Sequence, residues 1–301
     1  EFWLALVKVV AVVAMIVFGC WLLFSGHGGP EAAVSNIWAI GGFFPHGVGG
    51  LVMAMAIIMF SFGGLELVGI TAAEADDPQK SIPQATNQVI WRILIFYVGS
   101  IIVLLSLYPW TKVTANSSPF VMIFHDLGES LAANVLNLVF LTAALSVYNS
   151  CVYSNSRMLY GLARQGNGPK ALLKVDRRGV PYVALALSAA TTAICVLVNY
   201  LMPGEALGLF MALVVSALVI NWAMISYAHL KFRQAKAREG VQTRFKALLY
   251  PAGNWICLLF MIGILVIMAM TPGMAISVWL IPPWIIVLAI GYAVKNRLQK
   301  A

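Results

Sequence analysis

Charged residues are scarce in this sequence: they make up 10% of its 301 residues, whereas hydrophobic residues make up 61%. A chain of this composition cannot fold as a water-soluble globule, because it would expose far more apolar surface than solubility allows. The scarcity of charge therefore excludes a soluble domain and predicts a polytopic membrane protein of the all-α class.

Cysteine and histidine are also scarce, with four residues of each. The cysteines fall inside apolar runs without the spacing of a metal site, so we expect them to be small packing residues and not disulfides. All four histidines lie at or beyond the ends of those runs, and no HExxH or GxSxG pattern occurs. These absences argue against an enzyme and predict neither a metal nor another cofactor.

About eight apolar runs are long enough to cross a bilayer, which takes about 20 mostly apolar residues each. They cover residues 2–24, 48–75, 89–108, 134–162, 182–201, 206–228, 254–271 and 278–294. We expect one or two surface helices in the connection 117–132, and a turn with an amphipathic lead-in over 78–88. The loop 25–47, rich in Gly and Pro, is expected to lie against the lipid headgroups on the outer side.

Lysine and arginine gather in alternate connections between these runs. They are abundant in residues 163–181, in residues 229–253 and in the C-terminal tail, whereas residues 25–47, 202–205 and 272–277 have none. Because basic residues stay on the cytoplasmic side, both ends of the chain are predicted to be cytoplasmic. The net charge of +8 follows from this orientation and does not indicate a nucleic-acid partner.

The run from 48 to 75 is interrupted by the segment Ser61-Phe62-Gly63-Gly64-Leu65-Glu66. Glycine costs a helix about 1 kcal/mol per residue, and an ionisable residue in hydrocarbon costs about 2.5 kcal/mol or more. Backbone that leaves the helix at membrane depth is tolerated where it lines a cavity. We therefore predict a discontinuous helix with a binding site at its break, as in secondary transporters. Two alternatives stay open: close helix packing for the glycines, and a structural carboxyl for Glu66.

Three stretches carry a resemblance to a known family: FSFGGLELVGITAAEADDPQKSIPQATNQVIWRI, ALSVYNSCVYSNSRMLYGLARQGN and FKALLYPAGNW. They resemble bacterial amino-acid permeases of the amino acid/polyamine/organocation superfamily, and the similarity extends over the whole chain. It is greatest to members that carry aromatic amino acids. The resemblance implies a fold of two inverted five-helix repeats followed by two helices, with residues 1–301 forming one permease domain. This sequence would begin at the fifth helix, so helices one to four would be missing.

The resemblance also implies a function. It implies proton symport of the aromatic amino acids Phe, Tyr and Trp across the bacterial cytoplasmic (inner) membrane, with the amino acid, the proton and the lipid bilayer as partners. Two alternatives remain open. The chain could belong to a permease for another amino acid, or it could be a truncated fragment or substrate sensor that does not transport.

A zwitterionic amino acid needs separate hosts for its ammonium group, its carboxylate and its side chain. Unwound carbonyls suit the ammonium group, and the carbonyls of Phe60, Ser61 and Gly63 are the candidates. By resemblance, Phe60 matches the aromatic gate that closes over the substrate, with Phe62 beside it. The predicted substrate site at the break comprises Phe60, Ser61, Phe62, Gly63, Gly64 and Glu66.

The run 134–162 holds many polar side chains within about three turns, and these cannot all face lipid. We predict that Tyr148 and Asn149 line the substrate pocket, with hydrogen bonding between helices as the alternative. Arg157 lies deeper, on the side where Glu74, Asp76 and Asp77 end the broken helix. A cytoplasmic gate ion pair and simple snorkelling are both open interpretations of these charges.

Lys8 is the one basic residue inside the run 2–24. It must either snorkel to the interface or be neutral part of the time. By resemblance, a lysine of the family's fifth helix stands at this place in Val7-Lys8-Val9, where related sodium-coupled transporters hold a sodium ion. The resemblance therefore implies that Lys8 couples proton entry to helix rearrangement. An interfacial anchor is the alternative.

Overall fold

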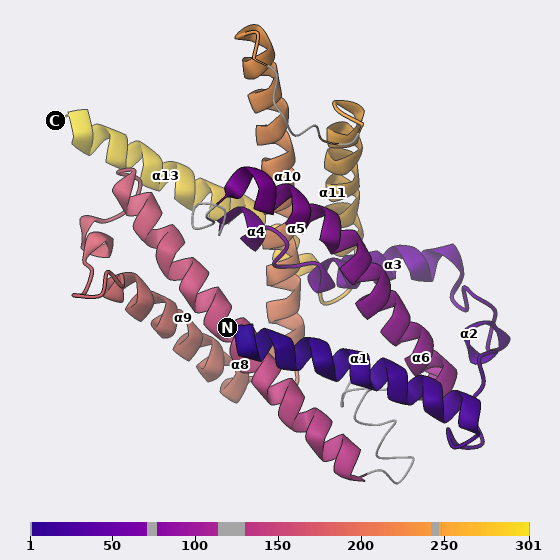
Figure 1. Cartoon of the computed structure of the whole chain (residues 1–301). Helices are drawn as coiled ribbons and strands as arrows, with labels where there is room; N and C mark the ends of the chain where they lie inside the picture. The colour runs from indigo at the N-terminus through magenta and orange to yellow at the C-terminus, as the bar shows by residue number, and fades with distance from the viewer. Residues whose placement is uncertain (1, 71–76, 114–129, 242–246, 248, 301) are drawn as a thin grey trace. The chain divides into compact units, whose positions relative to one another are not determined.

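The structure, a computed structural model, describes residues 2–70, 77–113, 130–241, 247 and 249–300 (Figure 1). Over these residues it consists of helices and their connections, without a strand, which confirms the predicted all-α class. Seven described helices are long and apolar enough to span a bilayer: Trp3–Ser25, Lys80–Leu107, Asn134–Arg164, Tyr182–Leu201, Ala206–Arg238, Ala252–Met270 and Ala275–Lys295. This confirms a polytopic membrane protein.

The chain divides into two compact units. The first contains residues 1–46, 68–164 and 168–188, and the second contains residues 47–67, 165–167 and 189–301. This division does not test the prediction that residues 1–301 form one permease domain, which stays a prediction.

The first unit is built around α1 (Phe2–Ser25), which packs on α6 (Gly99–Leu107) and α8 (Ser130–Arg164). Its other elements are α2 (Asn36–Ala39), most of α4 (Leu67–Ile70), α5 (Pro78–Arg92), η2 (Ile93–Val98), η3 (Trp110–Lys112), η4 (Lys170–Leu173) and the start of α9 (Tyr182–Leu201). Met15 and Leu22 of α1 are buried against Val103 and Leu107 of α6. This apolar seam fixes the pair α1 and α6.

The helix before α6 begins earlier than the sequence suggested. Asp77 accepts a hydrogen bond from the Lys80 N–H (3.3 Å), and Pro78 takes the first helical position, where a missing N–H costs nothing. The predicted turn over 78–88 is therefore wrong, whereas the predicted amphipathic lead-in is present as α5. The π-helix η2 that joins α5 to α6 was also missed, because one wide turn leaves the apolar pattern unchanged.

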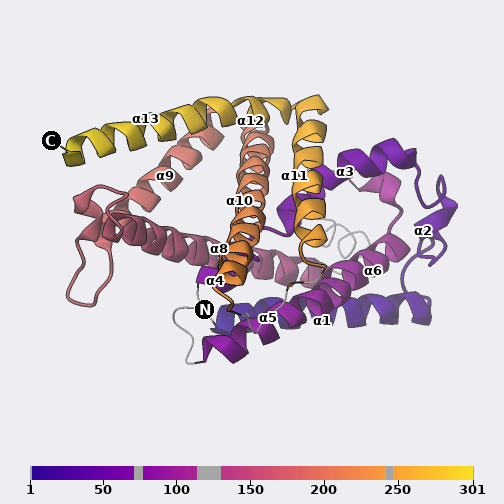
Figure 2. The ribbon, with the colours of Figure 1, turned by 90° about the horizontal axis from the view of Figure 1, so that it is seen from above.

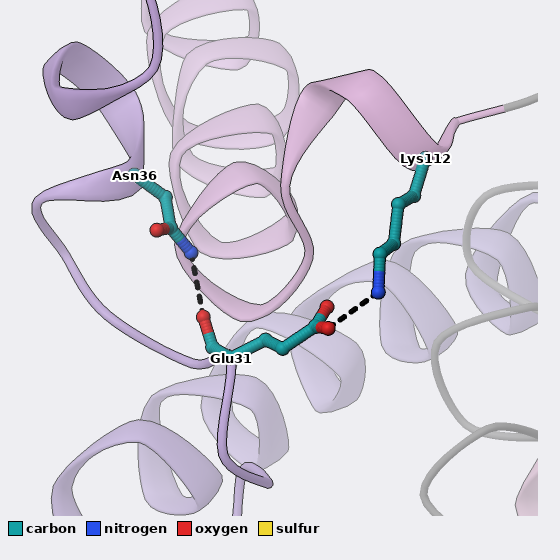
Figure 3. A network of polar contacts seen from close by, with 3 residues as sticks. All are labelled: Glu31, Asn36 and Lys112. Atoms are coloured by element: carbon teal, nitrogen blue, oxygen red, sulfur yellow. Dashed lines mark hydrogen bonds and ion pairs between the residues drawn. The ribbon is translucent and has the colours of Figure 1, made fainter.

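The loop after α1 is tied to the end of α6. The Ala33 N–H donates to the carbonyl of Ser106 (2.9 Å), and the indole N–H of Trp110 donates to the carbonyl of Ile40 (3.0 Å). Glu31 forms an ion pair with Lys112, and Asn36 Nδ2–H donates to the backbone carbonyl of Glu31 (2.8 Å; Figure 3). Contact of this loop with headgroups stays a prediction. The surface helices expected in 117–132 lie largely outside the described residues, apart from 130–132, which begin α8.

The second unit contains α3 (Gly47–Ser61), most of α9, α10 (Ala206–Arg238), α11 (Ala252–Met270), α12 (Ala275–Trp279) and α13 (Ile281–Lys300). Helices α10 and α11 run side by side, and α3 packs against both (Figure 2). The core between these three helices consists of Ala56, Met59, Val215, Val219, Met261, Ile264 and Met268. Because α3 leads directly into the predicted break, this core positions the break against α10.

Two predicted spans in the second unit are present, but their helices differ from the predicted bounds. Helix α10 runs to Arg238 and not to residue 228, because residues 229–238 are mostly good helix formers and Gly240 ends the helix with a positive φ of 70°. The span predicted over 278–294 lies within the apolar helical segment Ala275–Lys295, which has a turn at Leu280 between α12 and α13. Pro282 and Pro283 lie in the first turn of α13, where they lack N–H groups that a helix start does not need.

We expect Gly19 to be required for the close approach of α1 and α6. A Cβ atom built at Gly19 would lie 2.3 Å from Val103 Cγ1, and this β-branched side chain has little freedom to move. Gly19→Ala should therefore lower the free energy of unfolding by about 1–3 kcal/mol. Thermal unfolding of the full-length protein in detergent measures this loss.

Gly161→Ala is the matched control, since Gly161 lies in α8 with nothing within 4 Å of its built Cβ. It should be neutral or raise stability by up to about 1 kcal/mol. Equal unfolding temperatures for the two variants would contradict the packing role of Gly19.

Candidate functional site

The broken helix is present where the glycines and Glu66 predicted it. Helix α3 ends at Ser61, α4 begins at Leu67, and residues 62–66 form turns. Hydrogen bonds between residues three apart replace the helical pattern here. The Gly63 N–H donates to the Phe60 carbonyl (3.1 Å), and the Leu67 N–H donates to the Gly64 carbonyl (3.1 Å). The predicted discontinuity at Ser61 to Glu66 is confirmed.

The two glycines of the break, Gly63 and Gly64, have different structural roles. Gly64 adopts a φ of +99°, a conformation that side chains with a Cβ rarely take, so it makes the turn. Gly63 packs near α10, since a built Cβ would lie 2.8 Å from Leu218 Cδ1. Close packing, the alternative considered for these glycines, therefore accompanies the break and does not replace it.

Glu66 joins the break to α10. Its Oε2 accepts hydrogen bonds from the Gly64 N–H (3.2 Å) and from the indole N–H of Trp222 (3.1 Å). Both hydrogen bonds converge on one oxygen of a half-buried side chain, which leaves Oε1 able to meet a ligand donor. Glu66 thus has the structural role that we considered as an alternative, and it retains capacity for a ligand.

A cavity of about 820 Å³ lies between α3, α10 and α11, beside the break. Phe62 and Glu66 line it from the break, and Trp222 lines it from α10. Its size falls in the range of about 300–1,000 Å³ that is typical of small-molecule sites. The second unit therefore carries a mostly apolar pocket with one carboxylate.

The other predicted site residues are placed as follows. Phe60 is 42% exposed, and Ser61 and Gly63 are also exposed. These three residues lie at the break and are not among the residues that line the cavity. The Phe60 carbonyl already accepts the hydrogen bond from Gly63, so an ammonium group would be its second donor. Tyr148 and Asn149 are exposed on α8 in the first unit, and their part in a substrate pocket stays a prediction.

Lys8 contacts the polar stretch of α8. Its ammonium group donates a hydrogen bond to Ser146 Oγ (2.9 Å), and Ser146 is completely buried. The ammonium group is thus bound to a neighbouring membrane helix within the first unit. Ser146 belongs to the polar stretch of the run 134–162, but its pairing with Lys8 joins positions 138 residues apart and has no signal in the sequence.

The charges considered for a cytoplasmic gate make other contacts. The Arg157 guanidinium lies 4.1 Å from the centroid of the Tyr153 ring, and Asp77 caps α5. Glu74 and Asp76 lie outside the described residues, so a gate ion pair stays a prediction.

A second polar cluster on the cavity wall was missed. Asn254 Nδ2–H of α11 donates to the Ser226 carbonyl of α10 (2.9 Å) and lies 3.1 Å from His229 Nδ1. All three residues line the cavity. The α10 part was missed because the predicted span ended at residue 228, which placed His229 in a loop.

Comparison with known proteins decides the family. The amino acid permease family matches residues 1–301 of this chain. The chain belongs to the amino acid permease family. The chain is 73% identical, over all 301 of its residues, to the aromatic amino acid transport protein AroP of Escherichia coli (strain K12), and covers 66% of that protein.

Two further relatives show how far the similarity extends. AroP of Salmonella typhi is 69% identical over 300 residues, with 66% of it covered. The amino-acid permease AapA of Bacillus subtilis (strain 168) is 40% identical over 300 residues, with 65% covered. The chain therefore spans about two thirds of the length of the curated relatives that it matches. These relatives are named as a transport protein and a permease, which argues against an enzyme.

The hydrogen bond from the Trp222 indole N–H to Glu66 should stabilise the break. Trp222→Phe keeps the apolar packing but removes the N–H that Glu66 accepts, which should cost about 1–3 kcal/mol, as for hydrogen bonds to charged or buried groups. Thermal unfolding in detergent measures the loss. Trp255→Phe, at a 56% exposed position of α11, is the control, and an equal loss there would contradict a specific role for the indole N–H.

Proposed function

We propose that this permease takes part in the uptake of the aromatic amino acids Phe, Tyr and Trp across the bacterial inner membrane by proton symport. In this proposal both ends of the chain face the cytoplasm, as the distribution of Lys and Arg favours. The observation that carries the proposal is the broken helix with Glu66 at its end, since such breaks form substrate sites in secondary transporters. The names of the AroP relatives, aromatic amino acid transport proteins, support the aromatic substrate class.

The chemistry of the break suits the ammonium end of an amino acid. Carbonyl groups at Phe60, Ser61 and Gly63 present acceptors, and Glu66 supplies a carboxylate within the same short segment. We propose that Phe60 closes over the substrate ring by aromatic stacking, worth about 0.5–1.5 kcal/mol. Tyr148 and Asn149 are proposed to contact the substrate from α8.

Removing the Phe60 ring should affect aromatic substrates most. In the full-length protein, Phe60→Ala should weaken uptake of phenylalanine and tryptophan by about threefold to tenfold, because the stacking energy is lost. Uptake of radiolabelled amino acids into cells that lack competing permeases measures it, and Phe43→Ala in the outer loop is the control. Equal losses for alanine and tryptophan would remove the stacking role and favour a permease for general neutral amino acids, as the name of AapA allows. Absence of any uptake by the unmodified protein would contradict transport itself.

Lys8 is the proposed coupling residue. Its ammonium group bonds to Ser146 of α8 and so can hold α1 and α8 together while it is charged. Loss of the charge would weaken that bond, because a neutral amine is a poorer donor than an ammonium group. Proton transfer at Lys8 would thereby change the contact between two membrane helices.

Lys8→Met should abolish proton-driven accumulation while leaving exchange of labelled for unlabelled substrate, which needs no net coupling. Ser146→Ala should keep accumulation but shift its pH profile, since the charged amine loses its partner. Uptake between pH 5 and 8, with and without an uncoupler, measures both. Lys112→Met, at the end of η3, is the control. Accumulation by Lys8→Met with an unchanged pH profile would reduce Lys8 to an interfacial anchor.

A further inference from the structure

The cavity between α3, α10 and α11 has polar groups at two separate places on its wall. One is the carboxylate of Glu66, bound to Trp222, and the other is the cluster of Ser226, His229 and Asn254. We propose that this cavity binds an arylalkylamine, a molecule with a primary ammonium group, an aromatic ring and a polar substituent on that ring, but no carboxylate. This ligand is additional to the amino acid of the proposed function.

The carboxylate end selects a cation. The hydrogen bonds of Glu66 from Gly64 and Trp222 both end on Oε2 and hold the side chain in one orientation on the cavity wall. An ammonium group at Oε1 would complete the carboxylate's hydrogen bonding and balance its charge in a mostly apolar surrounding.

The composition of the wall argues against a ligand that carries its own carboxylate. Among the described residues that line the cavity there is no lysine or arginine, so a ligand carboxylate would have no fixed cation opposite it. Burying an unpaired carboxylate in an apolar cavity is costly. The cavity should therefore prefer an amine to the corresponding amino acid.

The second polar cluster suits a ring hydroxyl. Trp222 and His229 are seven residues apart on α10, which corresponds to about 10 Å along the helix axis. His229 and the Asn254 side chain are 3.1 Å apart and together present both donor and acceptor atoms. Tyramine, with its ammonium group and phenol at opposite ends, is the probe that matches this spacing.

The walls between the two polar places are apolar and adaptable. The residues that line these walls include Met55 and Met59 of α3, Phe260 and Met261 of α11, and Phe62 at the break. Methionine sulfur makes favourable contacts with aromatic rings and adjusts to their shape. An aryl ring is therefore the body that this wall fits best.

Binding of tyramine to the purified full-length protein in lipid nanodiscs, measured by calorimetry, tests the charged end. Glu66→Gln keeps the shape of the side chain and removes its charge, so tyramine should bind at least about tenfold more weakly. Glu205→Gln, a carboxylate in the same unit that does not line the cavity, should bind tyramine as the unmodified protein does. Equal affinities of the unmodified and Glu66→Gln proteins would overturn the proposal.

Cys257 gives a readout that needs no change at Glu66. It lines the cavity, whereas Cys151 is exposed on α8, so the two thiols report on the site and on the rest of the chain. Tyramine should slow alkylation of Cys257 by a small membrane-permeant maleimide at least about fivefold and leave Cys151 unchanged, with tyrosine at the same concentration protecting less. Unchanged labelling of Cys257 at saturating tyramine would overturn the cavity as the binding site.

His229→Leu tests the hydroxyl end. It should weaken tyramine binding while leaving phenethylamine, which lacks the hydroxyl, within about twofold. A parallel loss for both amines would overturn the assignment of the phenol to His229 and Asn254.

Failure of this proposal is distinguishable from failure of the proposed function. Uptake of phenylalanine without tyramine binding would overturn the amine site alone. Tyramine binding without uptake of any amino acid would overturn the transport proposal alone.

Discussion

The interaction on which the second unit depends is the acceptance of two N–H groups by one oxygen of Glu66. A carboxyl group in a membrane segment is costly unless it is hydrogen-bonded, and a broken helix is costly unless its free backbone groups find partners. Glu66 reduces both costs, since it binds the Gly64 N–H inside the break and the Trp222 indole outside it. The break is therefore a fixed feature anchored to α10.

The same anchor determines what surrounds the break. Helix α3 must lie on α10 and α11 for Trp222 to reach Glu66, and the apolar core around Met59, Val219 and Ile264 holds it there. Where that core ends, the side chains no longer fill the space, and the cavity beside Phe62 remains. The contact between Glu66 and Trp222 and the apolar core of α3, α10 and α11 together position an apolar pocket with the carboxylate of Glu66 on its wall.

The sequence could predict the features that have a strong local cost. Gly63-Gly64 next to Glu66 cannot continue a plain membrane helix, so the break was predictable to within a residue or two. Apolar runs of about 20 residues likewise predicted the spans. Helix ends were less predictable, because α10 continues beyond residue 228 until Gly240 ends it, and neither hydropathy nor charge marks that point.

Contacts between distant residues could not be predicted. Trp222 is 156 residues from Glu66, and Ser146 is 138 residues from Lys8. A tryptophan or a serine in an apolar run has many partners open to it until the helices are packed. The cavity and its second polar cluster needed the same information, since His229 and Asn254 meet only because α10 and α11 lie side by side.

Hydrogen–deuterium exchange of the full-length protein in nanodiscs tests the central claim most directly, that a non-helical break is fastened to α10 by Glu66. Backbone amides of residues 62–66 should exchange at least about a hundredfold faster than those of residues 53–59 in α3, because turns protect amides less than a continuous helix. Trp222→Phe should increase exchange in 62–66 further while leaving 53–59 unchanged. Uniform protection from 53 to 70, or a break whose exchange does not respond to Trp222→Phe, would contradict the account.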